Sequence, residues 1–133
     1  MIVVDTNIIG YLYLAGDRSA QAEQVLLKDP DWSAPLLWRS ELRNVLALYI
    51  RKNLLSLEDA QQIMGEAIKL LNGREYDVVS HQVLRLAATS TCSAYDCEFV
   101  ALAKDLDLPL VTTDQHILSQ FADITISLDT FIS

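Results

Sequence analysis

The sequence predicts an α/β protein whose sheet is mainly parallel. Short apolar segments rich in β-branched residues alternate with longer segments whose apolar residues recur at helical spacing. Strands that alternate with helices in this way form parallel sheets with helices on both faces. The 133 residues are enough for one domain with its own core. We therefore expect a single domain over residues 1–133, with a parallel sheet of four to five strands.

The first half of the chain contains two predicted strands and four predicted helices. The strands span 1–4 and 32–34, and the helices span 8–14, 18–28, 37–51 and 58–71. Asp17 is placed to cap the second helix, and Ser56 begins a capping box at the fourth. Trp38, Leu42 and Tyr49 recur at helical spacing, which predicts one buried face along 37–51.

The second half continues the alternation. Strands are expected at 76–79, 108–112 and 124–128, and helices at 81–89, 94–106 and 115–121. Ser93 is placed to cap the helix that begins at residue 94. Right-handed crossovers between parallel strands put every loop from a strand to its following helix at the same edge of the sheet.

Four acidic residues fall near that edge. Asp5 follows the first strand and Asp114 follows the strand at 108–112, while Asp96 and Glu41 lie in the first turns of two helices. Ligands of open α/β sheets bind at the carboxyl ends of the strands. The sequence therefore predicts that four carboxylates, drawn from the whole length of the chain, converge on one site.

Each acid also has a purely structural explanation. Asp5, Asp96 and Asp114 could cap the helices that follow them, because acids favour helix N-termini. Glu41 fits this explanation less well, since it borders the apolar face of its helix, where a carboxylate needs a partner. The helical wheel places Arg39 and Arg43 on the other flank.

Clustered carboxylates suit metal-assisted phosphoryl chemistry. Mg²⁺ and Mn²⁺ prefer oxygen ligands, and acids that repel one another favour a cation between them. Such an ion lowers the pKa of bound water and holds the phosphate oxygens during an in-line displacement. The sequence leaves open whether one ion or two would be held.

Composition excludes several other classes of protein. The net charge of −8 disfavours a nonspecific nucleic-acid binder, although Arg39, Arg43, Arg51 and Lys52 form a local basic stretch that could contact phosphates. No apolar run approaches the length of a membrane span, and the first residues do not resemble a secretory signal. The two cysteines lack the spacing of a zinc site. We expect a cytoplasmic protein with free thiols.

Four sequence blocks together resemble the PIN domain family, most closely the small ribonuclease toxins of VapBC-type toxin–antitoxin pairs. The blocks are VVDTN at 3–7, SELRNVL at 40–46, AYDCEFVALA at 94–103 and LVTTD at 110–114. Each block alone is a weak signal. All four occur in the family's order, at similar spacings, over nearly the whole chain.

The resemblance implies a Rossmann-like sheet and a nuclease that cuts RNA with metal-activated water. Catalytic and metal-binding roles would belong to Asp5, Glu41, Asp96 and Asp114, with Mg²⁺ or Mn²⁺ as the cofactor. Positioning by hydrogen bonds would belong to Thr6, Asn7 and Thr112. It also implies a homodimer, and a small antitoxin partner whose tail occupies the acidic groove.

Competing interpretations are a non-catalytic PIN-like interaction module and a phosphoacceptor or phosphatase of similar size. A receiver domain requires adjacent acids after its first strand, whereas Asp5 stands alone there. A haloacid-dehalogenase-like enzyme requires a second acid where Asn7 stands. Dinucleotide binders require a glycine-rich loop that this chain lacks. All four acids are present, so nothing in the sequence favours loss of catalysis.

Overall fold

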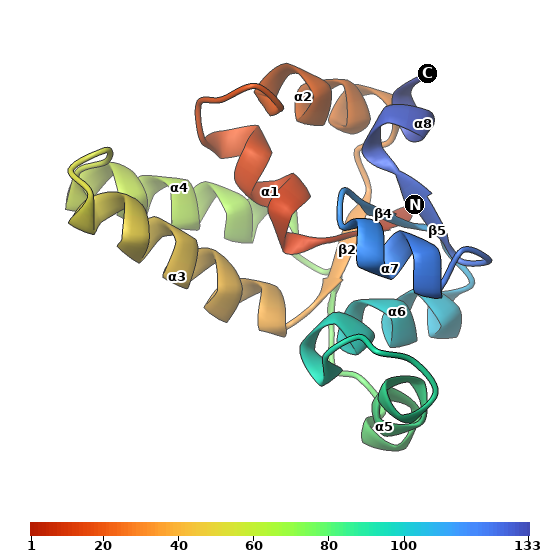
Figure 1. Ribbon diagram of the computed structural model, residues 1–133. Helices are drawn as coiled ribbons and strands as arrows, with labels where there is room; N and C mark the ends of the chain where they lie inside the picture. The colour runs from red at the N-terminus through yellow and green to blue at the C-terminus, as the bar shows by residue number, and fades with distance from the viewer.

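A five-stranded sheet lies at the centre of the computed structural model, which describes residues 1–133 (Figure 1). The strands are β1 (Ile2–Val4), β2 (Trp32–Pro35), β3 (Glu75–Tyr76), β4 (Leu110–Thr112) and β5 (Thr125–Ser127). Their order is β3-β2-β1-β4-β5, and every neighbouring pair is parallel. This arrangement confirms the predicted α/β class and places β1 in the middle, paired through Ile2 to Trp32 and through Val3 to Leu110.

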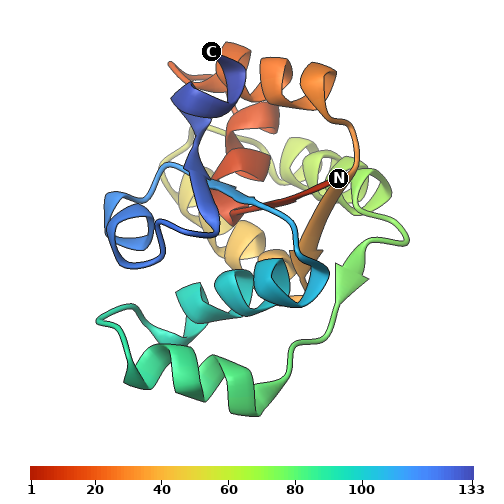
Figure 2. The same cartoon turned by 90° about the vertical axis from the view of Figure 1, so that its right-hand side faces the viewer.

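Helices cover both faces of the sheet. They are α1 (Thr6–Tyr13), α2 (Ser19–Lys28), α3 (Leu37–Arg51), α4 (Leu57–Leu70), α5 (Ser80–Ala88), α6 (Ala94–Leu106), α7 (Gln115–Gln120) and α8 (Leu128–Ile132). On one face α6 packs on β1, β2 and β4, and α5 covers α6 (Figure 2). On the other face α1 and α3 contact the sheet, with α2 and α4 packed outside them.

The core is one continuous cluster of 27 buried residues. All three residues of β1 are buried, as expected for a central parallel strand. Helix α6 is buried over Phe99–Ala103 because it lies between the sheet and α5, and a helix in such a position is apolar on most sides. None of the helices combines the length and the apolar character needed to cross a membrane.

Helix ends follow the local chemistry of the sequence. Ser56 Oγ accepts from the Asp59 N–H at 3.0 Å and Ser93 Oγ from the Asp96 N–H at 3.1 Å, which confirms both predicted caps. Asn53 and Gly73 follow α3 and α4 with φ of 58° and 80°. Left-handed residues after a helix are favourable for Gly and Asn, and they stop these helices where predicted.

Two expectations for individual elements were wrong, and one element was missed. The strand predicted at 76–79 is the two-residue β3, because its partner β2 ends at Pro35 and passes into α3, which leaves 77–79 without a neighbour. Asp17 does not cap α2; the cap position is Arg18, without a side-chain hydrogen bond. The sequence interpretation also missed α8, a short helix whose Ser127 cap accepts from the Thr130 N–H.

Candidate metal centre and active site

The four predicted acids meet in one hollow at the carboxyl ends of β1 and β4. The hollow has a volume of about 240 Å³, and its eight lining residues are Asp5, Thr6, Asn7, Glu41, Asn44, Val45, Asp96 and Asp114. Asp5 directly follows β1, and Asp114 lies two residues past β4. Helix α6 presents its acid from the first turn and α3 from the second. The predicted convergence is therefore present, from four separate segments of the chain.

Asp5 is the most buried of these acids and is held by two threonines. Its Oδ1 accepts from the backbone N–H of Thr6 at 2.8 Å, and its Oδ2 accepts from Thr112 Oγ1 at 2.8 Å. Thr6 Oγ1 also donates to Glu41 Oε1 at 2.7 Å. Thr6 and Thr112 thus fix the orientation of two carboxylates. Asn7, predicted to act with them, borders the hollow and is exposed.

An acid that lines the hollow can also cap a helix. Asp114 Oδ1 accepts from the N–H groups of His116 and Ile117, so this acid caps α7 as the structural explanation requires. The carboxylate of Asp96 has no hydrogen-bond partner, because Ser93 caps α6 in its place. Oxygens without a protein donor therefore remain on Glu41, Asp96 and Asp114.

The electrostatics of the hollow disfavour four negative charges. Burial raises the pKa of Asp5 to about 6, with the charges of Glu41 and Asp96 adding to the effect and the bonds from Thr112 and Thr6 opposing it. Burial and the charge of Asp96 raise the pKa of Glu41. Burial and the charge of Asp114 raise that of Asp96. No Lys or Arg lines the hollow, although the nearby His116 opposes the rise in the pKa of Asp96.

The donor set fits a hard divalent cation, although the present spacing is too wide to coordinate one. Carboxylate oxygens are the ligands that Mg²⁺ and Mn²⁺ prefer. No three of the acidic, His or Cys side chains lie close enough together to surround an ion as they stand. Repulsion keeps like charges apart when no cation lies between them. Coordination would therefore require the acids to draw together.

The basic stretch of α3 is only partly available for phosphate. Arg39 Nε and one terminal nitrogen each donate to Glu75 at 2.6 Å, and Trp38 Nε1 donates to the same carboxylate at 2.8 Å. These bonds hold the pKa of Glu75 below its usual range. Arg43 is exposed and bonds only to the Arg39 carbonyl and to Ser40. Arg39, predicted to contact phosphate, is thus already engaged, whereas Arg43 is free to do so.

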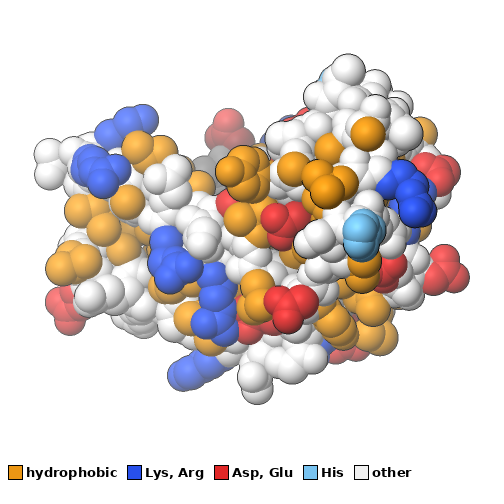
Figure 3. Space-filling view, turned by 90° about the horizontal axis from the view of Figure 1, so that it is seen from below, with side chains coloured by type: hydrophobic (Ala, Val, Ile, Leu, Met, Phe, Trp, Pro, Cys, Tyr) orange, Lys and Arg blue, Asp and Glu red, His pale blue; other side chains and the backbone are white.

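A space-filling view shows how charge is distributed on this face (Figure 3). Lys and Arg side chains gather on its left part, and acidic side chains lie near its centre.

Two residues near the site, Asn44 and Glu98, are not among the predicted site residues. Asn44 lines the hollow one helical turn after Glu41, and this i+3 spacing is the signal that could have found it. Burial raises the pKa of Glu98, and the charge of Glu41 adds to the shift, so Glu98 belongs to the surroundings of the site. Nothing in the sequence indicates that proximity, because α3 and α6 approach each other only in the fold.

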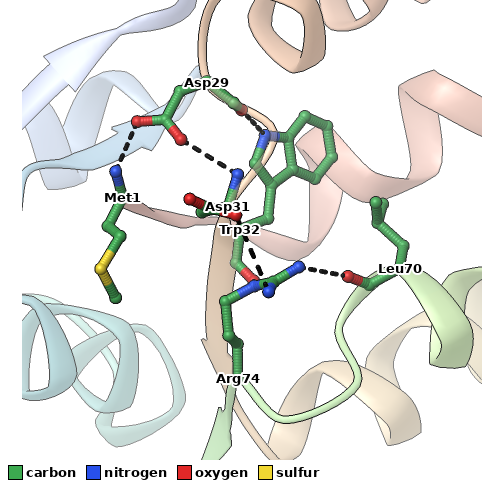
Figure 4. Close-up of polar contacts among 6 residues, drawn as sticks. All are labelled: Met1, Asp29, Asp31, Trp32, Leu70 and Arg74. Atoms are coloured by element: carbon green, nitrogen blue, oxygen red, sulfur yellow. Dashed lines mark hydrogen bonds and ion pairs between the residues drawn. The ribbon is translucent and has the colours of Figure 1, made fainter.

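Carboxylates at the opposite end of the sheet are compensated (Figure 4). Asp29 Oδ2 accepts from the N-terminal ammonium group at 2.7 Å, and its Oδ1 accepts from the Asp31 N–H. Arg74 lies 3.8 Å from Asp31 and donates to the carbonyl oxygens of Trp32 and Leu70. Each charge here has a partner of opposite sign, in contrast to the acidic hollow.

The fold and the hollow together define the class of protein. A parallel sheet in the order β3-β2-β1-β4-β5 carries four acids to the carboxyl ends of its central strands. This chain belongs to the PIN domain family, whose sequence model matches residues 2–124.

Individual relatives agree with the family. The chain is 29% identical over 123 residues to Ribonuclease VapC3 of Pyrobaculum aerophilum, covering 90% of this chain and 94% of the relative. The crystal structure of PAE2754 from the same organism superposes with a TM-score of 0.78 at 19% identity, over 98% of this chain and 85% of the other. A toxin–antitoxin complex from Klebsiella pneumoniae contains a chain with a TM-score of 0.68 at 19% identity, over 96% and 98%.

Proposed function

We propose that this protein is a Mg²⁺- or Mn²⁺-dependent endoribonuclease and the toxin of a type II toxin–antitoxin pair. The observation that carries the proposal is the hollow itself, which gathers Asp5, Glu41, Asp96 and Asp114 with no cationic side chain among its lining residues. An RNA phosphodiester is repelled by such a site unless a divalent cation neutralises it. The similarity to a VapC ribonuclease supports RNA as the substrate.

The four acids would hold one or two ions, and Thr6 and Thr112 would keep two of them oriented. A bound ion would supply activated water and a countercharge for the phosphate that is attacked. Thr112 Oγ1 fixes Asp5 by donating to Oδ2, and Thr6 Oγ1 fixes Glu41 by donating to Oε1. Glu41, Asp96 and Asp114 keep carboxylate oxygens without a protein donor, and these acids would draw together around the ion. Arg43 would contact a neighbouring phosphate from the exposed side of α3.

We further propose the partners and setting that such a toxin requires. A small antitoxin protein would inhibit it, in line with the toxin–antitoxin complex among the structural neighbours. We propose that residues 1–133 form a single PIN domain that acts as a homodimer in the cytoplasm. These proposals rest on the family relationship.

Cleavage of a mixed tRNA and rRNA pool by the purified protein tests the proposal. We expect cleavage with Mg²⁺ or Mn²⁺ and none with EDTA. Asp96→Asn should abolish it, whereas Asp31→Asn, which removes the same charge at the opposite end of the sheet, should not. Cleavage that persists in Asp96→Asn would contradict the proposed site. If the folded, antitoxin-free protein cut no RNA in any metal, the non-catalytic interaction module would be favoured.

A further inference from the structure

A second hollow lies beside the acidic one. Its volume is about 380 Å³, and it lies between α1, the turn from α1 to α2, and α3. Thr6, Asn7 and Val45 line both hollows, so the two adjoin. We call this second hollow the tyrosine pocket, after its lining residues Tyr11 and Tyr49.

The walls of the tyrosine pocket combine aromatic, cationic and polar groups. Tyr11 and Tyr49 are both half-buried, and the hydroxyl group of Tyr11 is held 3.2 Å from Thr113 Oγ1, next to the acid Asp114. The guanidinium carbon of Arg18 lies 5.9 Å from the centre of the Tyr11 ring. Aromatic faces with nearby guanidinium groups are the features on which unpaired bases stack in single-stranded nucleic-acid sites.

A glycine leaves the pocket open. Gly10 lies within α1 among the pocket's lining residues, and a Cβ atom added there would meet no atom within 4 Å. Glycine is unfavourable in a helix interior relative to alanine. A side chain at this position would project into free space without displacing the core. The missing side chain thus preserves volume in the pocket at some expense of helix stability.

We propose that the tyrosine pocket receives the base of a nucleotide adjacent to the phosphodiester that is cut. This inference rests on the proposed function and extends it to recognition of the substrate. Adjacency to the acidic hollow favours a nucleotide, because a chain with one phosphate at the acids must place its next base nearby. The polar side chains of Asn7, Asp17 and Arg18 also favour a base, which carries hydrogen-bonding edges, over an apolar peptide segment.

Binding of nucleosides tests the pocket independently of RNA cleavage. Adenosine, guanosine, cytidine and uridine, which carry no phosphate for the acidic hollow to repel, would be titrated separately, in EDTA and at millimolar concentrations, into the ¹⁵N-labelled protein. We expect at least one of them to shift the amide signals of Gly10 and Gly16 saturably. If none of the four shifts these signals, the proposal is overturned.

Two glycine variants separate pocket filling from a general effect of the substitution. Gly10→Leu fills the pocket, and Gly65→Leu places the same side chain in α4, where an added Cβ also meets nothing. We expect Gly10→Leu to weaken binding of the nucleoside at least about 10-fold, within the range of one stacked base. Gly65→Leu should leave this affinity unchanged. Gly10→Ala and Arg18→Gln serve as milder variants and should weaken binding in the same direction. Equal affinity in all four variants would overturn the proposal.

RNA cleavage by the same variants then connects the pocket to the substrate. We expect the wild type to prefer one base beside the cut and Gly10→Leu to lose that preference while it still requires the metal. An unchanged preference in Gly10→Leu would overturn the assignment of the pocket. If the wild type bound a nucleoside saturably but cut no RNA in any metal, the proposed function would be overturned. If it cut RNA with metal but bound no nucleoside in the pocket, only this inference would be overturned.

Discussion

The carboxylates described at the two ends of the parallel sheet differ in whether they have cationic partners. At the amino ends of the strands, Asp29 meets the N-terminal ammonium group and Asp31 lies near Arg74. At the carboxyl ends, four acids line one hollow, and burial raises the pKa of Asp5, Glu41 and Asp96. Repulsion adds to each shift, from Glu41 and Asp96 at Asp5, from Asp96 at Glu41 and from Asp114 at Asp96. The chain has only ten Lys and Arg residues against eighteen acids, and none of these cations lines the acidic hollow.

This difference indicates that the repulsion in the acidic hollow comes from where the fold places the acids, and not only from the excess of acidic residues in the chain. Glu75 has Arg39 and Trp38 as partners near the same edge of the sheet, and its pKa is lowered. A carboxylate close to the hollow can therefore be neutralised by the fold. Repulsion among four acids that lack a cation destabilises the folded protein. The arrangement therefore favours binding of a cation from solution.

The largest expected effect is the loss of RNA cleavage when an acid of the hollow is neutralised. Asp5→Asn, Glu41→Gln, Asp96→Asn and Asp114→Asn should each lower kcat/KM at least about 100-fold, because a metal supplies several kcal/mol of transition-state stabilisation. Circular dichroism should show an intact fold. Asp31→Asn is the charge-matched control at the other end of the sheet. Full activity of Asp5→Asn would contradict the assignment.

The next effect is a pH dependence of stability in the metal-free protein. The pKa of Asp5 is about 6 in the folded protein against an ordinary value of 3.8, so the folded state binds more protons between these pH values. The free energy of unfolding should therefore fall as pH rises from about 4 to about 6, by about 2 kcal/mol. Urea titrations at several pH values measure this.

Asp5→Asn sharpens that test. The amide carries no charge, and its oxygen can still accept from the Thr6 N–H. The variant should show a smaller decline between pH 4 and pH 6, because only Glu41 and Asp96 keep raised pKa values, and it should exceed the wild type in stability at pH 7. A wild-type stability that rises over this range by the same amount would show that the charge of Asp5 is compensated.

Removing the guanidinium group of Arg74 at the amino ends of the strands should lower the free energy of unfolding. It should not change the stabilisation that the metal produces. Arg74→Met removes two hydrogen bonds to backbone carbonyl oxygens and leaves those acceptors without their donor. We expect a loss of about 1–2 kcal/mol in the free energy of unfolding. The increase in Tm produced by Mg²⁺ should equal that of the wild type. A smaller increase would indicate that the two ends of the sheet are coupled.

The smallest effect is expected at the exposed arginine of α3. Arg43→Gln should weaken RNA binding a few-fold and reduce the salt dependence of the affinity by about one counterion, without a preference among sequences. Binding at several salt concentrations measures this slope. An effect limited to one RNA sequence would indicate a base contact in place of a phosphate contact.

Much of the fold could be predicted because it is encoded locally. Helix α3 spans the predicted 37–51, and Ser56 and Ser93 cap their helices as expected. The convergence of the four acids followed from strand–helix alternation and the common edge of a parallel sheet. Their catalytic role stays a prediction.

The remainder depends on contacts between distant segments. Arg39 binds Glu75, 36 residues away, because β2 and β3 pair, and no local pattern indicates this. The orientation of Asp5 and Glu41 depends on bonds from Thr112 and Thr6, which composition does not reveal. The tyrosine pocket likewise forms from α1 and α3, whose approach appears only in the assembled fold.

Calorimetric titration with Mn²⁺ tests the central claim most directly, namely that the acidic hollow is a cation site. We expect binding by the wild type, with more protons released at pH 6 than at pH 8, because a ligand with a raised pKa must lose its proton. Asp96→Asn should bind at least about 10-fold more weakly, by about 1.4 kcal/mol, while Asp31→Asn binds as the wild type does. Equal affinity in Asp96→Asn, or no binding by the wild type, would contradict the claim.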